Sequence, residues 1–176
     1  KIKDKFENLI YGEGQEDILD KVHSLLISKK LSVSTAESFT GGLIAERLTE
    51  KGGSSQYFLG SIVAYQQKIK EDLLNIGSDF FKKHSVVSEE CVTKMAENAA
   101  EIFNSDLVVA TTGAAGPSAH NGKTAGTMYL ALNYKGEINC FKFSKNYGRK
   151  MNRFYASQIA LFEIYKMIKE SGENNA

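Results

Sequence analysis

Tryptophan is absent from this chain of 176 residues, and proline, cysteine and histidine are scarce, with one, two and three copies. The two cysteines, Cys91 and Cys140, lie far apart and show neither a CxxC nor a Cys/His spacing. His23, His84 and His120 are also scattered, which argues against a zinc site. Both cysteines fall in segments typical of regular structure, so the sequence predicts buried free thiols.

Long apolar runs and a strong excess of either charge are missing as well. No run approaches the roughly 20 apolar residues that span a bilayer, and the N-terminal segment lacks the apolar core of a signal peptide. A formal net charge of +1 gives no global field to attract nucleic acid or a membrane surface, so any anion site must be local. We therefore expect a cytoplasmic protein that binds neither nucleic acid nor a membrane.

The remaining composition is that of one ordinary globular domain. Hydrophobic residues make up 42% of the chain and charged residues 24%, and the length suffices for a sizeable core. We expect residues 1–14 to form an N-terminal extension and residues 171–176 a disordered tail. No repeat, low-complexity segment or linker divides the chain between them.

Periodicity predicts helices that alternate with strands. Apolar residues at helical spacing indicate helices at 16–29, 40–50, 66–76, 89–103 and 149–170. Runs of β-branched and aromatic residues indicate strands at 31–37, 57–65, 106–113 and 127–144, the last range being two strands joined by a turn at Lys135 and Gly136. This order predicts a three-layer α/β/α sandwich with a mixed β-sheet.

The stretch STAESFTGGLIAERLTE, residues 34–50, places much polar chemistry at a predicted strand-to-helix turn. Ser38, Thr40, Gly41 and Gly42 would lie at the N-terminus of the helix, where backbone N–H groups and the helix dipole form a local anion site. The two glycines would allow a ligand to approach the backbone closely. Plain N-capping explains the same residues equally well, so both interpretations stay open.

The loop GPSAHNGKT, residues 116–124, looks like a Walker A phosphate loop but does not have its spacing. Five residues separate Gly116 from Gly122 where the motif has four, and a strand rather than a helix is predicted to follow. The preceding TTGAAG is more informative, because N–H groups near Thr112 and Gly113 could face a substrate oxygen. A strand exit that needs glycine for its dihedral angles is the alternative.

Two groups of basic residues follow predicted element boundaries. Tyr65, Lys68 and Lys70 come after a strand, where α/β proteins commonly present site residues, and a lysine removed from water can act as a base. Arg149 and Arg153 lie four positions apart on one helix face, which suits contact with a phosphate or carboxylate. A solvated lysine and ordinary salt bridges are the simpler explanations, and neither group is decisive alone.

Taken together, these motifs resemble the C-terminal domain of the competence/damage-inducible protein CinA, a family that includes stand-alone nicotinamide mononucleotide (NMN) amidohydrolases. The resemblance runs from about Leu31 to Leu161 and is carried by AESFTGG, GSSQYFLGSIVAY followed by Lys70, VSEE, TTGAAGP, GT at 126–127 and the Arg149/Arg153 pair. It implies an α/β/α fold, a homo-oligomer, no metal or cofactor, and hydrolysis of NMN to nicotinate mononucleotide and ammonia.

By position, the family's motif residues fall on Ser38, Tyr65, Lys70, Thr112 and Arg149. Amide hydrolysis needs a nucleophile, a proton acceptor and an oxyanion stabiliser. As a hypothesis, Ser38 attacks the carboxamide carbon with Lys70 as base, and Tyr65 orients the lysine or relays a proton. N–H groups around Thr112 and Gly113 would hold the oxyanion, and Arg149 would bind the 5′-phosphate.

The sequence leaves a second assignment and a second function open. Thr40, Gly41 and Gly42 could instead cradle the phosphate, with Lys70 activating a water molecule directly. A catalytically weak or inactive nucleotide-binding or regulatory module is the rival to an active amidase. Phe39, where the family has Cys or Ser, and Gln67, where it has Asn, are departures that bear on activity.

Overall fold

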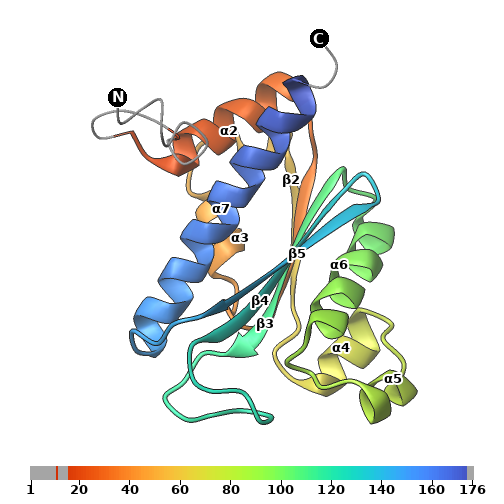
Figure 1. Ribbon diagram of the computed structural model, residues 1–176. Helices are drawn as coiled ribbons and strands as arrows, with labels where there is room; N and C mark the ends of the chain where they lie inside the picture. The colour runs from red at the N-terminus through yellow and green to blue at the C-terminus, as the bar shows by residue number, and fades with distance from the viewer. Residues whose placement is uncertain (1–10, 12–15, 174–176) are drawn as a thin grey trace.

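The computed structural model describes residue 11 and residues 16–173 and contains one five-stranded sheet (Figure 1). The strands are β1 (Val33–Glu37), β2 (Phe58–Val63), β3 (Leu107–Ala114), β4 (Thr127–Tyr134) and β5 (Glu137–Ser144), in the spatial order β2-β1-β3-β4-β5. β2, β1 and β3 run parallel, whereas β4 is antiparallel to β3 and β5 is antiparallel to β4. The predicted mixed sheet is confirmed.

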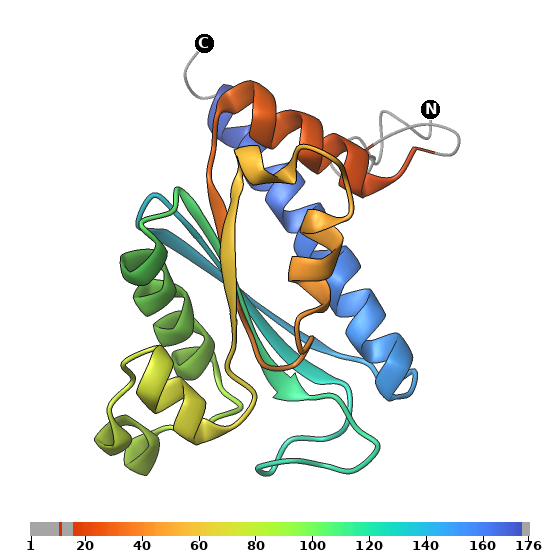
Figure 2. The same ribbon diagram turned by 180° about the vertical axis from the view of Figure 1, so that it is seen from behind.

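Helices cover both faces of this sheet (Figure 2). One face carries α2 (Ile18–Lys29), α3 (Leu43–Thr49) and α7 (Arg149–Glu173); the other carries α4 (Gln67–Leu73), α5 (Ser78–Lys83) and α6 (Glu89–Phe103). Successive residues of β3 serve the two layers in turn, since Val109 belongs to the first core and Val108 to the second. The fold is therefore the three-layer α/β/α sandwich that the sequence predicts.

Local sequence signals account for the helix α6. Ser88 caps α6, with its hydroxyl accepting from the N–H of Cys91 at 3.1 Å, and Glu89 and Glu90 occupy the first turn near the positive end of the helix dipole. Met95, like Cys91, lies on the fully buried face. The capped helix predicted at 89–103 is confirmed to the residue.

Several predicted boundaries are wrong. α3 begins at Leu43 rather than at residue 40, because Gly41 and Gly42 both have positive φ angles and lie before the helix. The short helix α5 was not predicted, and α7 continues to Glu173, into the expected tail at 171–176. Residues 1–10, 12–15 and 174–176, with most of the expected extension, lie outside the described part of the chain.

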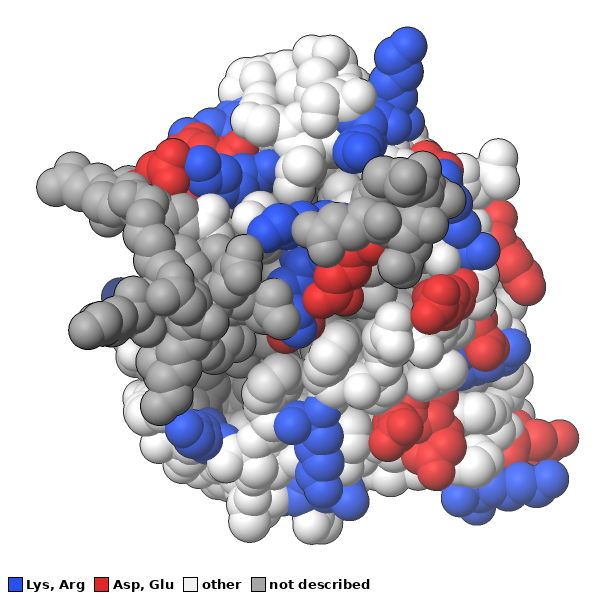
Figure 3. Space-filling view, turned by 45° about the horizontal axis from the view of Figure 1, so that its top comes forward, with Lys and Arg blue, Asp and Glu red and all other residues white. Residues whose placement is uncertain are grey.

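The prediction that both cysteines are buried free thiols is confirmed for Cys91 but is wrong about the burial of Cys140. Cys91 and Cys140 are both free; Cys91 is fully buried, whereas Cys140 lies on the edge strand β5 and is half-buried. Among residue 11 and residues 16–173, no helix is long and apolar enough to cross a membrane, and no cluster of potential metal ligands occurs. Basic and acidic side chains are interspersed on the face shown in Figure 3, as the near-neutral net charge suggests.

Candidate functional site

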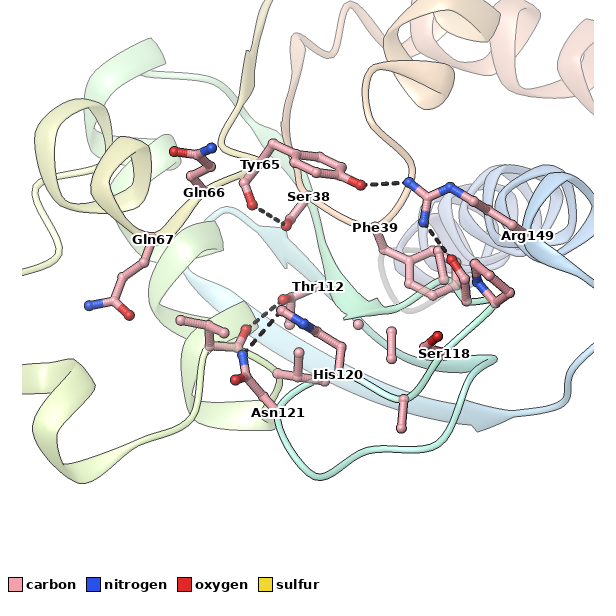
Figure 4. A pocket seen from close by; sticks show the side chains of 18 of the residues that line it. Ser38, Phe39, Tyr65, Gln66, Gln67, Thr112, Ser118, His120, Asn121 and Arg149 are labelled. Carbon is pink, nitrogen blue, oxygen red and sulfur yellow. Dashed lines mark hydrogen bonds between the residues drawn. The ribbon is translucent and has the colours of Figure 1, made fainter.

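The carboxyl ends of the parallel strands open into a cavity of about 570 Å³ (Figure 4). Its walls come from the turn after β1, the segment from β2 into α4, the loop after β3, and the first residue of α7. Parallel strands bring their carboxyl ends to one edge of a sheet, so segments distant in sequence meet there. Six residues singled out in the sequence line the cavity together: Ser38, Tyr65, Lys70, Thr112, Gly113 and Arg149.

A serine and a lysine are in direct contact at this cavity. Ser38 follows β1 immediately, and its N–H donates to the carbonyl of Thr111 on β3 at 2.9 Å, which fixes its backbone. Lys70 Nζ donates to Ser38 Oγ at 3.1 Å and to the carbonyl oxygen of Ala64 at 2.6 Å. Ser38 Oγ in turn donates a long hydrogen bond of 3.5 Å to the carbonyl oxygen of Tyr65.

The lysine of this pair is buried, which is unusual for its residue type. Only 2% of Lys70 and 9% of Ser38 is exposed. Burial lowers the pKa of Lys70 below its usual value of 10.5, and the neighbouring Cys91 acts in the opposite direction. The uncharged amine, whose lone pair can accept a proton, therefore forms at lower pH than it does in water. Lys68, by contrast, is exposed and pairs with Asp72 at 2.9 Å.

Arg149 and Tyr65 bridge the mouth of the cavity. Arg149 Nη2 donates to the hydroxyl of Tyr65 at 2.5 Å, and Nη1 donates to the carbonyl of Gly116 at 2.8 Å (Figure 4). The expected contact between Tyr65 and Lys70 is not made, because the tyrosine hydroxyl is bonded to the arginine. An oxygen that accepts from arginine still carries its own hydrogen, which it can donate to a ligand.

Gly113 and Phe39 form a tightly packed part of the wall. A Cβ atom on Gly113 would lie 2.4 Å from the carbonyl oxygen of Thr127 and 2.5 Å from Cδ2 of Phe39. The bulky Phe39 is buried with its ring against this glycine. Thr112 is bonded elsewhere: its hydroxyl donates to the carbonyl of Val86 at 2.6 Å and so ties β3 to the segment before α6.

Replacing Gly113 by alanine should destabilise the domain, because the new methyl group would collide with backbone as well as with the ring. We expect the free energy of unfolding to fall by at least about 2 kcal/mol. Denaturant unfolding of Gly113→Ala beside Gly52→Ala tests this, since a Cβ on Gly52 meets nothing within 4 Å. Equal small effects of the two substitutions would contradict the packing described here.

A carboxylate of the protein itself occupies the N-terminus of α3. The buried side chain of Glu37 accepts hydrogen bonds from the N–H groups of Gly42, Ile44 and Ala45 at 2.9, 3.1 and 2.8 Å, and from the hydroxyl of Thr40 at 2.6 Å. The carboxylate of Glu37 therefore occupies the anion site that was expected at this helix end. Thr40 is fully buried, and neither it nor the two glycines, 41 and 42, is among the residues that line the cavity.

Arg153 supports the same turn and does not line the cavity. Its Nε and Nη2 atoms donate to the carbonyl of Thr40 at 2.9 and 2.7 Å, and its guanidinium lies against Gly41. The two predicted arginines therefore contact different parts of the structure. Arg149 lines the cavity, whereas Arg153 holds α7 to the turn that follows Ser38.

Sequence reasoning missed the far wall of the cavity. This wall includes Val86, Val87, Ser118, His120 and Asn121. His120 and Lys123 exchange backbone hydrogen bonds of 2.9 and 3.0 Å that close the tip of the loop. The loop is followed by the strand β4 and not by the helix that a P-loop requires, so the sequence argument against a P-loop is confirmed. A loop has no periodicity that would reveal which side chains face inward. Gln66 and Gln67 also line the cavity, and the Gln67 amide donates to Glu71 at 2.8 Å.

Fold and site together define an α/β/α domain with a serine and a buried lysine paired at the carboxyl edge of a mixed sheet. The chain belongs to the CinA C-terminal domain family, whose pattern it matches over residues 15–168. It is 37% identical over 161 residues to a CinA-like protein of Dictyoglomus thermophilum, covering 91% of this chain and 39% of that protein. This chain thus spans about two fifths of the length of the curated relatives it matches.

Solved structures of the family share the fold. A competence-damaged protein (CinA) superfamily protein from Klebsiella pneumoniae superposes with a TM-score of 0.84 at 25% identity, covering 87% of this chain and 96% of that one. A competence/damage inducible protein from Agrobacterium tumefaciens gives a TM-score of 0.80 at 30% identity, with coverage of 90% and 99%. The family resemblance seen in the sequence is confirmed.

Proposed function

We propose that this domain is an amidase that hydrolyses the carboxamide of NMN to nicotinate mononucleotide and ammonia. The observation that carries the proposal is the contact of 3.1 Å between the buried amine of Lys70 and the hydroxyl of Ser38 at a cavity of nucleotide size. A serine is a weak nucleophile unless a base takes its proton, and a desolvated lysine is a suitable base.

In the first half of the proposed reaction, Ser38 Oγ bonds to the carboxamide carbon while its proton passes to the neutral amine of Lys70. The resulting tetrahedral intermediate collapses, the C–N bond breaks, and the departing nitrogen takes a proton from the Lys70 ammonium to leave as ammonia. Water then attacks the acyl carbon and gives a proton to Lys70. The bond between the acyl carbon and Ser38 Oγ breaks, Oγ takes that proton back from Lys70, and nicotinate mononucleotide leaves as the carboxylate after its acid proton is lost to solvent.

The backbone N–H of Gly113 is the best-placed group to hold the oxyanion. The carbonyl of Thr111 faces β1, where it accepts from Ser38, and the carbonyl of Ala114 faces β4, where it accepts from Gly126 at 2.7 Å. Backbone groups alternate along a strand, so Gly113 faces the β1 side, just beyond the last residue of β1. The N–H of Thr112 faces β4, so of the two N–H groups first proposed to hold the oxyanion, only that of Gly113 keeps this role.

Arg149 is the cation proposed to bind the 5′-phosphate. It extends over the mouth of the cavity from α7, and two of its five N–H groups serve Tyr65 and Gly116, which leaves others for a ligand. Occupation of the α3 N-terminus by Glu37 argues against the alternative in which that helix end cradles the phosphate and Lys70 activates water. Ser38 is therefore favoured as the nucleophile.

Ammonia release from NMN, measured beside plain nicotinamide, tests the proposed function. We expect release from NMN and little from nicotinamide, which lacks the phosphate that Arg149 would bind. A covalent adduct on Ser38, trapped from NMN and detected by mass spectrometry, would separate the serine mechanism from direct attack by water. Binding of NMN without ammonia release would instead support the rival, a nucleotide-binding or regulatory module.

Loss of the Arg149 side chain should affect substrate binding more than chemistry. We expect Arg149→Ala to raise KM for NMN by about 10-fold or more, the usual effect of losing a hydrogen bond to a charged group, with a smaller change in kcat. Lys169→Ala, at an exposed position on the same helix, is the matched control and should leave KM unchanged. A lower kcat at constant KM would place Arg149 in the chemical step instead.

A further inference from the structure

Lys70 is a buried basic side chain without an acidic partner. Only 2% of the residue is exposed, and its amine donates to two neutral oxygens, the hydroxyl of Ser38 and the carbonyl of Ala64. Lys70 forms no ion pair with any residue in the described part of the chain. An ammonium group has three N–H donors, so one remains for a ligand. Buried charges are usually paired, and here the counter-ion has to come from outside the chain.

The cavity that Lys70 lines contains basic side chains and no acid. Arg149 lies at its mouth and His120 on its far wall, whereas neither aspartate nor glutamate occurs among the described residues of the lining. Glu37, which precedes Ser38 in the chain, does not line the cavity, because its carboxylate accepts from the N-terminus of α3. The cavity therefore favours a ligand with two anionic groups, one for its interior and one for its mouth.

We propose that the amine of Lys70 forms a carboxylate-binding site that holds the pyridine carboxylate product of the reaction. This inference rests on the proposed function, in which a neutral carboxamide becomes a carboxylate beside this amine. The lysine has already been removed from water by folding, so a carboxylate gains the ion pair without that part of the usual desolvation cost. The N–H of Gly113 binds its second oxygen. Nicotinate mononucleotide, with a carboxylate for Lys70 and a phosphate for Arg149, should therefore bind more tightly than NMN.

Product binding and catalysis need opposite charge states of Lys70. The carboxylate pairs with the ammonium, whereas Ser38 is activated by the neutral amine. Burial lowers the pKa of Lys70, so the ammonium is lost at a lower pH than in water, and above that pH a bound carboxylate draws a proton from solvent onto the amine. Cys91, which acts on this lysine from α6, stays uncharged, because burial raises the pKa of its thiol to about 11. Affinity for the product should thus fall as pH rises.

Isothermal titration calorimetry compares the acid with the amide. Ser38→Ala lacks the proposed nucleophile but keeps the amine, so NMN and nicotinate mononucleotide can both be titrated without turnover. We expect the acid to bind at least about 10-fold more tightly than NMN near neutral pH, the usual effect of a hydrogen bond between charged groups. In Lys70→Met, which keeps Ser38, this preference should disappear. Equal affinities in Ser38→Ala, or an unchanged preference in Lys70→Met, would overturn the proposal.

The pH profile of this preference identifies the group responsible. Both ligands carry the same phosphate, so the ratio of their affinities in Ser38→Ala removes the titration of the phosphate itself. This ratio should fall as pH rises. His120, Tyr65 and Arg149 are the other titratable side chains of the lining, and histidine ordinarily changes charge between about pH 5 and 8. Adding His120→Gln should leave the profile unchanged; a profile lost with His120 would assign the preference to the histidine and overturn the proposal.

Ammonia release from NMN by the native chain separates this inference from the function on which it rests. With release, nicotinate mononucleotide should be a competitive inhibitor that acts more strongly at lower pH. Release without a preference for the acid would leave the amidase and overturn the carboxylate site. A preference for the acid without release would support the carboxylate site and count against the amidase. Failure of either nucleotide to bind variants that circular dichroism shows to be folded would overturn both.

Discussion

Lys70→Met should reduce ammonia release from NMN by about 1,000-fold or more, because the Lys70 amine is the base that contacts Ser38 Oγ, at 3.1 Å. The other hydrogen-bond partner of this oxygen among the described residues is the carbonyl of Tyr65 at 3.5 Å, which is not a base. The fold should survive. Methionine fills nearly the same volume, and an apolar side chain avoids the cost of keeping an amine in a site of which only 2% is exposed. We expect the free energy of unfolding to change by less than about 2 kcal/mol, the loss coming from the unpaired carbonyl of Ala64.

The matched control for this experiment is Lys68→Met in the same helix, where the side chain is exposed and pairs with Asp72. It should retain normal turnover.

In the native chain, kcat should rise with pH as the Lys70 ammonium loses its proton, and the midpoint should lie below the usual lysine pKa of 10.5 because burial lowers the pKa of this amine. Turnover of Lys70→Met within 10-fold of native would remove the lysine from the chemistry.

Glu37→Gln should destabilise the domain by roughly 3 kcal/mol, since an amide NH₂ group cannot accept the hydrogen bonds that a carboxylate oxygen accepts. Whichever way the amide is oriented, at least one backbone N–H of the α3 N-terminus would face another donor. The loosened turn would also move Ser38, the next residue in the chain. We therefore expect reduced ammonia release at temperatures where the variant is still folded.

Urea unfolding of Glu37→Gln beside Glu46→Gln measures this effect. Glu46 lies in the first turn of the same short helix but is exposed, so its neutralisation should cost only a few tenths of a kcal/mol. Similar stabilities for the two variants would show that the buried carboxylate does not hold the turn. An unfolding loss at Glu37 with unchanged activity would mean that Ser38 is positioned by β1 and β3 alone.

Much of the fold could be predicted from local patterns in the sequence. The hairpin turn at Lys135 and Gly136, the Ser88 cap and the buried strand β3 each depend on a few consecutive residues, and all three were predicted correctly. The motif serine, lysine and arginine could be singled out in the same way, because strand ends and helix starts are visible as changes of periodicity. The helix start at 40 was misplaced because two glycines with positive φ belong to the turn.

What the sequence by itself determined is thus the order of the elements apart from α5, the family, and the positions of Ser38, Lys70 and Arg149. The tertiary structure alone decided what each group touches, because the partners lie far apart in the chain: Lys70 contacts Ser38 across 32 positions, and Arg149 contacts Tyr65 across 84. It also showed that Glu37 fills the helix end proposed for a phosphate. Helix and strand patterns arise from neighbours in sequence, whereas contacts, burial and pKa arise from neighbours in space.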